Sequence, residues 1–406
     1  MINIIGLGYI GLPTILMFAK KGLKVVGTDY NAKLIKRLNN KEIIFEEKGI
    51  EKLFNEALNG SVKFTTEYQV TDMYLVAVPT PYNKNSKKID AKYVIEAVNS
   101  ILNICKDNTV IIIESTIAPG TIDNILTPLV KNNISSKDKN IHLVHAPERI
   151  IPGNMIYELE HNSRTIGAER HDIGEKVANI YRKITVGEVV VTDVKSAEMT
   201  KVVENTFRAV NIAFANELTK ICHHDGMDVY EIIKLCNMHP RVSILNPGPG
   251  VGGHCIPVDP WFLVGDYPLL TNLIKESLNI NESMPEYVLH RTREIMSYTG
   301  IKDYNRVGIY GLTYKENVDD YRESPSLQLI EKQRNHLAAP LKSYDPWISD
   351  DIVTNQYQDF DKFLNDIDLV IIMVKHDHIM ENFAKLYNKV ILDTQNVITN
   401  KGVYKL

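Results

Sequence analysis

The chain of 406 residues has few cysteines, only two tryptophans and little net charge. Its cysteines, Cys105, Cys222, Cys236 and Cys255, form no C-x-x-C pair and no zinc-type spacing, which excludes a disulfide-rich scaffold and favours a reducing compartment. The formal charge of −4 gives no sign of a nucleic-acid partner, and no apolar run reaches membrane-spanning length. We therefore expect a soluble, cytoplasmic protein of two or three domains, without a resident metal.

A glycine motif stands close to the N-terminus. The apolar run Ile2 to Ile5 leads into G-L-G-Y-I-G, followed by a helical segment and a second apolar run that ends at Asp29. In a dinucleotide fold, the three glycines, here Gly6, Gly8 and Gly11, permit a tight turn, close approach of a pyrophosphate and close helix packing. A carboxylate about twenty residues on accepts hydrogen bonds from the adenosine ribose and repels a 2′-phosphate. The motif predicts NAD binding; a purely structural turn is the alternative.

Polar residues follow three further apolar runs. They are Thr80, the triplet at Glu114 to Thr116, and the sequence HAPER that ends in Glu148 and Arg149. Since the carboxyl ends of parallel strands form the ligand-binding edge of a sheet, Thr80, Ser115 and Thr116 can bond cofactor or water, or simply cap strand ends. Glu148 can be a general base or a solvated loop carboxylate.

From Ser196 the pattern changes to one long helical stretch that ends near Gly226, a residue type that often caps a helix. Lys201, Asn205 and Arg208 fall on one face of this helix. A polar stripe of this kind is either functional or merely solvated. The apolar stripe of the same helix can form a dimer contact, or it can be buried within one domain.

A glycine- and proline-rich segment, Asn246 to Phe262, reads NPGPGVGGHCIPVDPWF. This composition predicts a shaped loop rather than a helix or strand. Cys255 within it can be held partly as thiolate and attack a carbonyl carbon, or it can be a small buried hydrophobe. Upstream of the loop, His239 and Arg241 can reach a phosphate or a carboxylate.

The last third predicts a second α/β unit. After a connecting helix over Met284 to Tyr298, the strand Arg306 to Tyr310 ends in a loop that carries Lys315 and Arg322. Both suit a diphosphate, although surface charge pairs are the alternative. We expect an α/β fold: two Rossmann-like doubly wound domains, 1–190 and 296–406, joined by a mainly helical domain, 191–295, with the long helix and the cysteine loop.

The motifs, taken in order, strongly resemble the UDP-sugar 6-dehydrogenase family over nearly the whole chain. They are G-x-G-x-x-G with Asp29, EST, APER, K-x-x-x-N, GPGVGGHCIPVDP and GLTYKENVDDYRESP, and the cysteine loop is the most specific of them. HAPER followed by Ile150-Ile151-Pro152-Gly153, together with HPRV, looks closest to the UDP-N-acetyl-D-mannosamine dehydrogenases of bacterial polysaccharide synthesis.

One departure from the family's glucose enzymes bears on the substrate. UDP-glucose dehydrogenases commonly carry a second carboxylate shortly after the Pro-Glu pair, where this chain has Arg149 and then Pro152. An arginine there suits an N-acetyl carbonyl or the product carboxylate, which favours a UDP-N-acetylhexosamine.

The resemblance implies a four-electron oxidation of a sugar C6 alcohol to a carboxylate with two molecules of NAD, through a thiohemiacetal and a thioester on Cys255. It implies that Lys201 and Asn205 stabilise an oxyanion, that Thr116 and Asp259 position water or protons, and that Glu148 activates the hydrolytic water. Implied NAD contacts are Gly6, Gly8, Tyr9, Ile10, Gly11, Asp29, Thr80, Ser115, Thr116 and Arg322. Implied UDP-sugar contacts are Arg149, Ile150, Lys201, Asn205, Arg208, His239, Arg241, Gly253, Tyr314 and Lys315.

Other functions stay open at this point. The substrate can be UDP-glucose or UDP-N-acetylglucosamine instead. A two-electron dehydrogenase of the β-hydroxyacid type shares the Rossmann domain and a helix-borne lysine but needs no nucleophilic cysteine. A nucleotide-sugar-binding regulator would need no thiol at all. The family is usually dimeric through the long helix, so we expect a homodimer.

Overall fold

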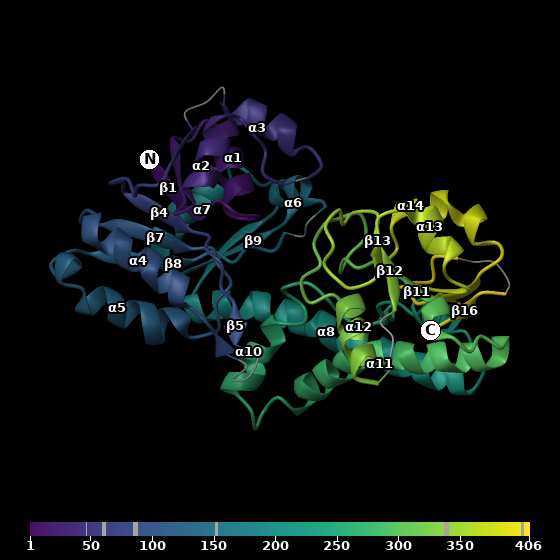
Figure 1. Cartoon of the computed structure of the whole chain (residues 1–406). Coiled ribbons are helices and arrows are strands. Elements are labelled where there is room, and N and C mark those ends of the chain that lie inside the picture. The colour runs from purple at the N-terminus through teal and green to yellow at the C-terminus, as the bar shows by residue number, and fades with distance from the viewer. Residues whose placement is uncertain (46, 59–61, 84–87, 151–152, 337–340, 399–401) are drawn as a thin grey trace. The chain divides into compact units, whose positions relative to one another are not determined.

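The computed structural model describes residues 1–45, 47–58, 62–83, 88–150, 153–336, 341–398 and 402–406 (Figure 1). It divides into two compact units, Met1–Glu204 and Asn205–Leu406. Ile151 and Pro152, on which part of the substrate prediction depends, lie outside the described residues. The three-domain division with bounds at 190 and 295 stays a prediction.

The first unit is built on an eight-stranded sheet in the order β10-β9-β8-β7-β4-β1-β2-β3. Neighbouring strands are parallel except β8 and β9, which are antiparallel. Six neighbouring strands of this sheet, β3-β2-β1-β4-β7-β8, have the order 3-2-1-4-5-6 of a dinucleotide-binding fold. The strands are β1 (Ile2–Ile5), β2 (Val25–Thr28), β3 (Val62–Thr65), β4 (Met73–Val76), β7 (Thr109–Ile113), β8 (Ile141–His145), β9 (Arg164–Ala168) and β10 (Val189–Thr192).

Helices connect these strands. Every residue of β1, β2, β4 and β7 is buried, as expected for parallel strands covered on both faces. The connecting helices are α1 (Gly11–Lys20), α2 (Ala32–Asn39), α3 (Ile50–Leu58), α4 (Lys92–Ile104), α5 (Thr127–Asn132), α6 (Met155–His161) and α7 (His171–Tyr181); a short hairpin pairs β5 (Tyr82–Asn83) with β6 (Lys88–Ile89). The polar residues after β1, β2, β4, β7 and β8 therefore share one edge.

The second unit contains a six-stranded parallel sheet in the order β13-β12-β11-β14-β15-β16. Two of its helices, α11 and α12, pack side by side (Figure 1). The strands are β11 (Val307–Tyr310), β12 (Lys342–Tyr344), β13 (Gln356–Tyr357), β14 (Leu369–Ile372), β15 (Val390–Asp393) and β16 (Tyr404–Lys405). The helices are α9 (Val229–Cys236), α10 (Asp259–Asp266), α11 (Asn272–Thr299), α12 (Pro325–His336), α13 (Phe360–Asn365) and α14 (Asp377–Glu381).

The long helix α8 (Val194–His224) begins in the first unit and continues into the second. It starts two residues before the predicted Ser196, and Gly226 follows its end with φ +70°. Asn281 of α11 joins this helix in the second unit: its Nδ2 donates to the carbonyl of Ala209 at 2.9 Å. In the part of the chain that the structure describes, no helix is long and apolar enough to cross a membrane.

The predicted fold class, two Rossmann-like α/β sheets with helices between them, is confirmed. The predicted connecting helix over Met284 to Tyr298 is too short, because α11 begins at Asn272 and holds Pro285 in its interior. Proline usually marks the first turn of a helix, so a sequence pattern gives no reason to extend this helix through it. The antiparallel strand β9 was not predicted from the sequence.

Candidate functional site

The glycine turn after β1 has the shape that a dinucleotide requires. Gly6 has φ +89°, and a Cβ on it would lie 2.7 Å from the carbonyl oxygen of Ala77. A Cβ on Gly11 would lie 1.8 Å from the carbonyl oxygen of Gly6, so both positions demand glycine. A Cβ on Gly8 would meet nothing within 4 Å, which leaves its side of the turn open at the N-terminal end of α1. This opening fits a pyrophosphate.

Asp29 lies directly after β2 and is 9% exposed. Its Oδ2 accepts the N–H of Leu7 at 2.9 Å, and its Oδ1 accepts the N–H of Asn31 at 2.9 Å. Each carboxylate oxygen retains acceptor capacity after these bonds. Asp29 is thus fixed beside the turn and fits a ribose hydroxyl pair.

Two predicted NAD contacts flank this turn. The ring of Tyr9 stacks on Phe45 with centroids 4.6 Å apart, and Ile10 precedes the first residue of α1. At the end of β4, Thr80 is half-buried. The hydroxyl of Ser115 donates to the carbonyl of Val78 at 2.8 Å, which matches the strand-capping alternative for this residue.

Two predicted catalytic residues meet in the first unit. The Nζ of Lys201, on α8, donates to the Oγ1 of Thr116, in the loop that follows β7, at 2.6 Å. An ammonium group has three N–H donors, so Lys201 keeps two for another oxygen. The lysine is partly exposed, which leaves it accessible to a ligand.

Glu148 and the two residues after it form a tightly bonded loop. Glu148 is 3% exposed, and its Oε1 accepts the backbone N–H groups of Arg149 at 2.6 Å and Ile150 at 3.0 Å. The guanidinium of Arg149 pairs with Glu204 at 2.5 Å and donates to the carbonyl of Ser163 at 2.6 Å. Both side chains are thus held by the protein, and Glu148 is no solvated loop carboxylate.

Sequence reasoning missed a charged cluster next to Glu148. Arg164, the first residue of β9, lies 2.5 Å from Glu148 and 3.6 Å from Glu114, and all three are buried. Burial, with the nearby Glu148 as the second cause, raises the pKa of Glu114 to about 8. The available signals were an arginine at the head of an apolar run and a glutamate directly after another, since a buried charge is seldom left without a partner.

In the second unit, Asn205 joins α8 to α10. Its Nδ2 donates to the Oδ2 of Asp259 at 2.6 Å, and its Oδ1 accepts a short hydrogen bond from Arg208. Asn205 and Asp259 are both 2% exposed. The bond to Arg208 fixes which way the amide faces, and one N–H of Asn205 remains for another acceptor. Three predicted site residues are therefore brought together.

The turn that Cys255 begins is tied to this cluster. The carbonyl of Cys255 accepts the N–H of Val258 at 3.1 Å and that of Asp259 at 2.8 Å, so the turn runs directly into α10. The thiol-bearing residue is partly exposed, unlike the buried Cys105 and Cys222. Cys255 is therefore not fully buried, and its role as a nucleophile stays a prediction.

The glycines before Cys255 allow close packing on the second sheet's loop. A Cβ on Gly252 would lie 2.6 Å from the Cβ of Tyr314, and one on Gly253, which has φ +86°, would lie 2.9 Å from its ring. The N–H of Gly253 donates to the carbonyl of Arg322 at 2.9 Å. Arg322 itself is exposed and paired with Asp320 at 2.5 Å. The cysteine loop and the loop after β11 thus form one packed structure.

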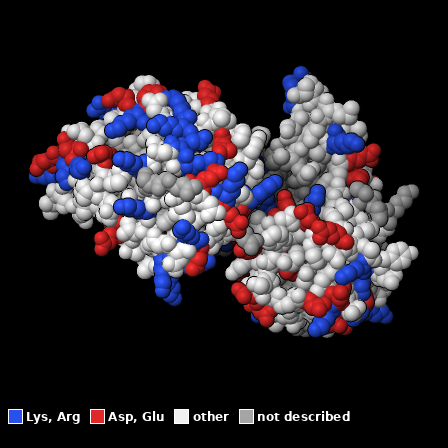
Figure 2. Space-filling model, turned by 90° about the horizontal axis from the view of Figure 1, so that it is seen from above, with Lys and Arg blue, Asp and Glu red and all other residues white. Residues whose placement is uncertain are grey.

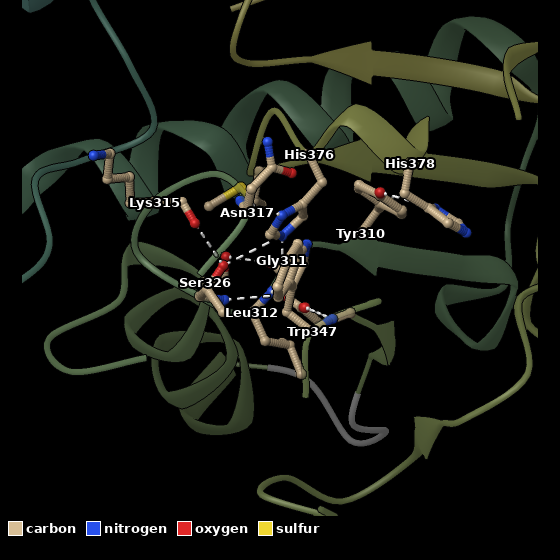
Figure 3. Close-up of polar contacts among 12 residues, drawn as sticks. Tyr310, Gly311, Leu312, Lys315, Asn317, Ser326, Trp347, His376 and His378 are labelled. Carbon is tan, nitrogen blue, oxygen red and sulfur yellow. Dashed lines mark hydrogen bonds and ion pairs between the residues drawn. The ribbon is translucent and has the colours of Figure 1, made fainter. Parts of the chain in front are cut away.

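The loop after β11 is held by buried polar groups (Figure 3). The Oδ2 of Asp345 accepts the N–H of Leu312 at 2.6 Å and that of Thr313 at 3.0 Å. His376, which is fully buried, lies 3.3 Å from the same oxygen, and its Nδ1 accepts the N–H of Asn317 at 3.0 Å. These bonds hold the loop that presents Lys315, whose side chain is half-buried.

His239 and Arg241 lie on the surface after α9 and contact each other: Arg241 Nη2 is 3.4 Å from His239 Nε2. Neither is joined to the cysteine loop by a described bond. Both basic and acidic residues lie on the face of the molecule shown in Figure 2. Among the described residues, no group of three or more His, Cys, Asp or Glu side chains could hold a metal ion.

Comparison with known proteins gives matches along nearly the whole chain. Three domain models of the UDP-glucose/GDP-mannose dehydrogenase family match: the NAD binding domain over residues 1–185, the central domain over 195–283 and the UDP binding domain over 308–400.

Individual relatives match over similar lengths. A UDP-N-acetyl-D-mannosamine dehydrogenase of Methanocaldococcus jannaschii is 40% identical over 98% of this chain and 93% of its own length. An NDP-N-acetyl-D-galactosaminuronic acid dehydrogenase of Ralstonia nicotianae is 34% identical over 99% and 97%. The solved UDP-N-acetyl-mannosamine dehydrogenase of Staphylococcus aureus superimposes with a TM-score of 0.87 at 41% identity, over 100% of this chain and 98% of that one.

Proposed function

The chain belongs to the UDP-glucose/GDP-mannose dehydrogenase family, and from this premise we propose that it oxidises UDP-N-acetyl-D-mannosamine at C6 to the uronate in two NAD-dependent steps. The names of several relatives at 36–40% identity support this substrate. Arg149 follows Glu148 in the segment where the glucose enzymes commonly carry a second carboxylate, and its guanidinium pairs with Glu204 and donates to the carbonyl of Ser163. The relative from Ralstonia nicotianae is named for an N-acetyl-D-galactosaminuronic acid instead, so the experiment below has to compare the hexosamine epimers.

The observation that carries the proposal is the bond between Asn205 and Asp259. It ties α8 to the turn that begins at Cys255, so a nucleophile and an oxyanion donor share one rigid structure. A binding protein or a two-electron dehydrogenase needs no such pairing of a thiol with a preorganised amide. The same bond leaves Asn205 one N–H to give to a substrate oxygen.

In the first oxidation, the C6 hydroxyl gives its proton to a water molecule positioned by Thr116 while C6 loses a hydride. NAD, when bound at the glycine turn, accepts a hydride in each oxidation. Lys201 stabilises the developing oxygen charge with its two remaining N–H groups, and Thr116 holds the ammonium in place at 2.6 Å. The product of this step is an aldehyde at C6.

Cys255 then adds to the aldehyde carbon as a thiolate, and the oxygen takes a proton from the same water, which gives a thiohemiacetal. Return of that proton to water and loss of the second hydride from C6 give a thioester. A water molecule adds to the thioester carbon, the C–S bond breaks, and the carboxylate and the free thiolate are released, with one proton of the water taken up by Glu148 and the other passed to solvent. Asn205 stabilises the oxyanion in both covalent steps, with Asp259 fixing the amide, and Glu148 takes the proton of the attacking water.

The UDP part of the substrate is assigned to the second unit. The packing of Tyr314 on Gly252 and Gly253 supports a binding surface made jointly by the cysteine loop and the loop after β11, with Lys315 and Arg208 as cations for the diphosphate. His239, Arg241 and Arg322 remain predicted contacts. A role in surface polysaccharide synthesis and a cytoplasmic location also remain predictions.

We further propose that the chain pairs with a second copy through α8. Phe207, Phe214 and Ile221 recur every seven residues in the second unit and are 64%, 50% and 55% exposed. Residues seven apart lie on one side of a helix, so they form an apolar stripe that another copy of the helix can cover.

The decisive experiment offers UDP-N-acetylmannosamine, UDP-N-acetylgalactosamine, UDP-N-acetylglucosamine and UDP-glucose side by side with NAD. We expect turnover of UDP-N-acetylmannosamine with two NADH formed per sugar, and at least tenfold lower kcat/KM for the others. Efficient turnover of UDP-glucose alone would refute the substrate. One NADH per sugar would refute the four-electron reaction, and tight binding of UDP-sugar with no NADH from any of the four would favour the regulator.

A further inference from the structure

Three charged side chains lie together inside the first unit, behind the loop that follows β8. Glu114 is 1% exposed, and Glu148 and Arg164 are 3% exposed. The Nη1 of Arg164 is 2.5 Å from Glu148 Oε2 and 3.6 Å from Glu114 Oε1. One guanidinium therefore serves two buried carboxyl groups. Because two buried negative charges cannot both be neutralised by one positive charge, one carboxyl group is expected to hold a proton.

The surroundings assign that proton to Glu114. Its oxygens accept hydrogen bonds from the hydroxyl groups of Tyr181 at 2.9 Å and Thr14 at 3.4 Å, which lower its pKa by less than burial and the charge of Glu148 raise it. Glu148 instead lies 2.5 Å from Arg164 and accepts two backbone N–H groups, so both of its oxygens already face donors. Burial first, and then the charge of Glu148, raise the pKa of Glu114 to about 8.

Arg164 has donors to spare. Its guanidinium lies over the ring of Tyr181, 4.8 Å from the centroid, and its Nε and Nη2 have no hydrogen-bond partner among the described residues. A buried guanidinium with unused donors will turn toward any new negative charge within reach. An ionised Glu114 is such a charge, so it would compete with Glu148 for Arg164.

Arg164 also determines the shape of the loop above it. The carboxylate that it holds accepts the N–H groups of Arg149 and Ile150, at 2.6 and 3.0 Å. Ser163, directly before Arg164, accepts a hydrogen bond from the guanidinium of Arg149 at 2.6 Å. A movement of Arg164 away from Glu148 would therefore loosen both ends of this loop.

We propose that Arg164 is a positioning residue for Glu148, and that a proton on Glu114 is what allows Arg164 to hold the Glu148 carboxylate. This rests on the proposed function, in which Glu148 takes a proton from the hydrolytic water. While Glu114 is neutral, the guanidinium of Arg164 stays on Glu148, and the loop keeps its hydrogen bonds to Glu148 and Ser163. When Glu114 ionises, the guanidinium is shared and Glu148 leaves its working position, so hydrolysis slows on the alkaline side.

The other titratable groups around the cluster do not produce this dependence. His145, at the end of β8, has its pKa lowered to about 3 by burial, so it stays neutral. Burial and the neighbouring Glu114 raise the pKa of the Tyr181 hydroxyl well above its ordinary value. Of the described groups packed here, Glu114 is thus the one whose charge is expected to change near pH 8.

The first test replaces Glu114 with glutamine, which resembles the protonated acid but cannot ionise. For wild-type enzyme we expect kcat to fall about tenfold from pH 7.5 to 9.5, because ionised Glu114 then competes with Glu148 for Arg164. For Glu114→Gln we expect kcat at pH 7 within about twofold of wild type and a fall of less than about threefold over the same range. Identical pH profiles for folded wild type and Glu114→Gln would overturn the proposal.

The second test compares Arg164→Lys with Arg164→Met. We expect Arg164→Met to lower kcat by about 10²-fold with KM for NAD changed less than threefold, and with a burst of NADH because hydrolysis becomes limiting. Arg164→Lys keeps a positive charge, so its kcat should be about tenfold higher than that of Arg164→Met. Arg182→Met, which removes an exposed pair with Glu175 at 2.7 Å in the same unit, should leave kcat unchanged. A folded Arg164→Met enzyme with wild-type kcat and no burst would refute the positioning role.

A readout without substrate separates this proposal from the proposed function. If Glu114 holds a proton in the folded chain, the Tm of wild type falls more steeply between pH 5 and 8 than the Tm of Glu114→Gln. Parallel Tm curves would overturn the assignment of the proton even if the enzyme oxidises the sugar. Diverging curves from a chain that oxidises none of the UDP-sugars would support the proton assignment and refute the proposed function. They would also refute the role given to Arg164.

Discussion

Asp29 and Asp345 occupy the same place in the two sheets. Each lies directly after the strand that pairs with the first strand of its sheet, β2 beside β1 and β12 beside β11. The N–H of Leu7 donates to one oxygen of Asp29 at 2.9 Å, and the N–H of Leu312 donates to the equivalent oxygen of Asp345 at 2.6 Å. In both cases the other oxygen accepts the N–H of the residue two positions later.

The two positions differ in what else surrounds the carboxylate. Thr313 gives Asp345 a further N–H, and His376 lies 3.3 Å away. Because Nδ1 of His376 accepts an N–H, its proton is on Nε2, which faces the carboxylate. The carboxylate of Asp345 therefore accepts hydrogen bonds from groups of the protein, whereas that of Asp29 can still accept hydrogen bonds from a ribose. The second sheet thus has a turn of the same kind, in which the acidic residue bonds groups of the protein itself.

Because of this difference, we expect replacement by asparagine to affect NAD binding at Asp29 and stability at Asp345. Asp29→Asn should raise KM for NAD roughly tenfold, because bonds to a charged acceptor are worth about 1.5–3 kcal/mol. Its Tm should change little, since the amide oxygen still accepts the N–H of Leu7 or Asn31. Steady-state kinetics and thermal unfolding check this. Asp345→Asn is the matched control: a KM for NAD that rises equally in both variants would contradict the assignment of the cofactor to the first turn.

The acid stability of the second unit should depend on Asp345. Burial alone would raise its pKa, but the hydrogen bond from His376 and those from the backbone N–H groups of Trp347 and Leu312 hold the pKa below its ordinary value. A lowered folded-state pKa gives stability that is present above the unfolded value of about 3.9 and is lost as the pH falls through the folded value. In Asp345→Asn the Tm should be lower at pH 7 and should fall less steeply below about pH 4.

The control for this experiment is Asp361→Asn. Asp361 pairs with Lys385 at 2.7 Å on the surface, and such a pair contributes about 0–1 kcal/mol. Its Tm curve should follow that of wild type. If Asp345→Asn shows the wild-type acid dependence while its neutral Tm is reduced, the carboxylate is not the group that titrates.

The sequence was sufficient for features set by local pattern. The glycine turn with Asp29, the buried strands and the long helix follow from spacing and from the conformational needs of glycine, which act within a few residues. The contact between Lys201 and Thr116 joins residues 85 positions apart, so it depends on how the helix packs against the end of the strand. Only the family motifs that contain the two residues indicated that both belong to the site.

Features that depend on distant partners could not be predicted. Arg164 begins a strand that was not predicted, and nothing near it in the chain indicates Glu114 or Glu148 as partners. The pairing arises because β9 runs antiparallel beside β8, an exception that the alternating pattern does not predict. In the same way, the start of α11 before Pro285 is set by tertiary packing rather than by propensity.

The bond between Lys201 and Thr116 predicts graded effects on kcat. Lys201→Met removes the charge that stabilises the oxyanion and should lower kcat by about 10²–10³-fold, as loss of an oxyanion donor does. Thr116→Val removes only the acceptor that orients the ammonium, so its loss should be smaller, about tenfold. Thr116→Ser keeps the hydroxyl and should remain within about threefold of wild type. Equal losses for serine and valine at position 116 would rule out the hydroxyl as the cause.

Substitution of Cys255 should trap the reaction. In Cys255→Ser, an ester replaces the thioester, and since an alkoxide is a poorer leaving group than a thiolate, the ester should accumulate. Intact-protein mass spectrometry after mixing with substrate and NAD should show a covalent adduct. Cys236→Ser, at an exposed cysteine, should show wild-type turnover and no adduct. Full activity of Cys255→Ala with one NADH per sugar would instead favour a two-electron dehydrogenase.

The exposed stripe on α8 predicts how the chain associates. Phe214 lies between Phe207 and Ile221, so Phe214→Glu places a charge at the centre of the surface that a second copy would cover. Burying an unpaired carboxylate costs several kcal/mol, which would shift a dimer to monomers at micromolar concentration. Light scattering should give twice the chain mass for wild type and the single mass for Phe214→Glu. Tyr387→Glu, at a tyrosine that is 90% exposed and is not part of α8, should keep the wild-type mass. A monomeric wild type would leave the stripe for a contact within one chain and refute the dimer.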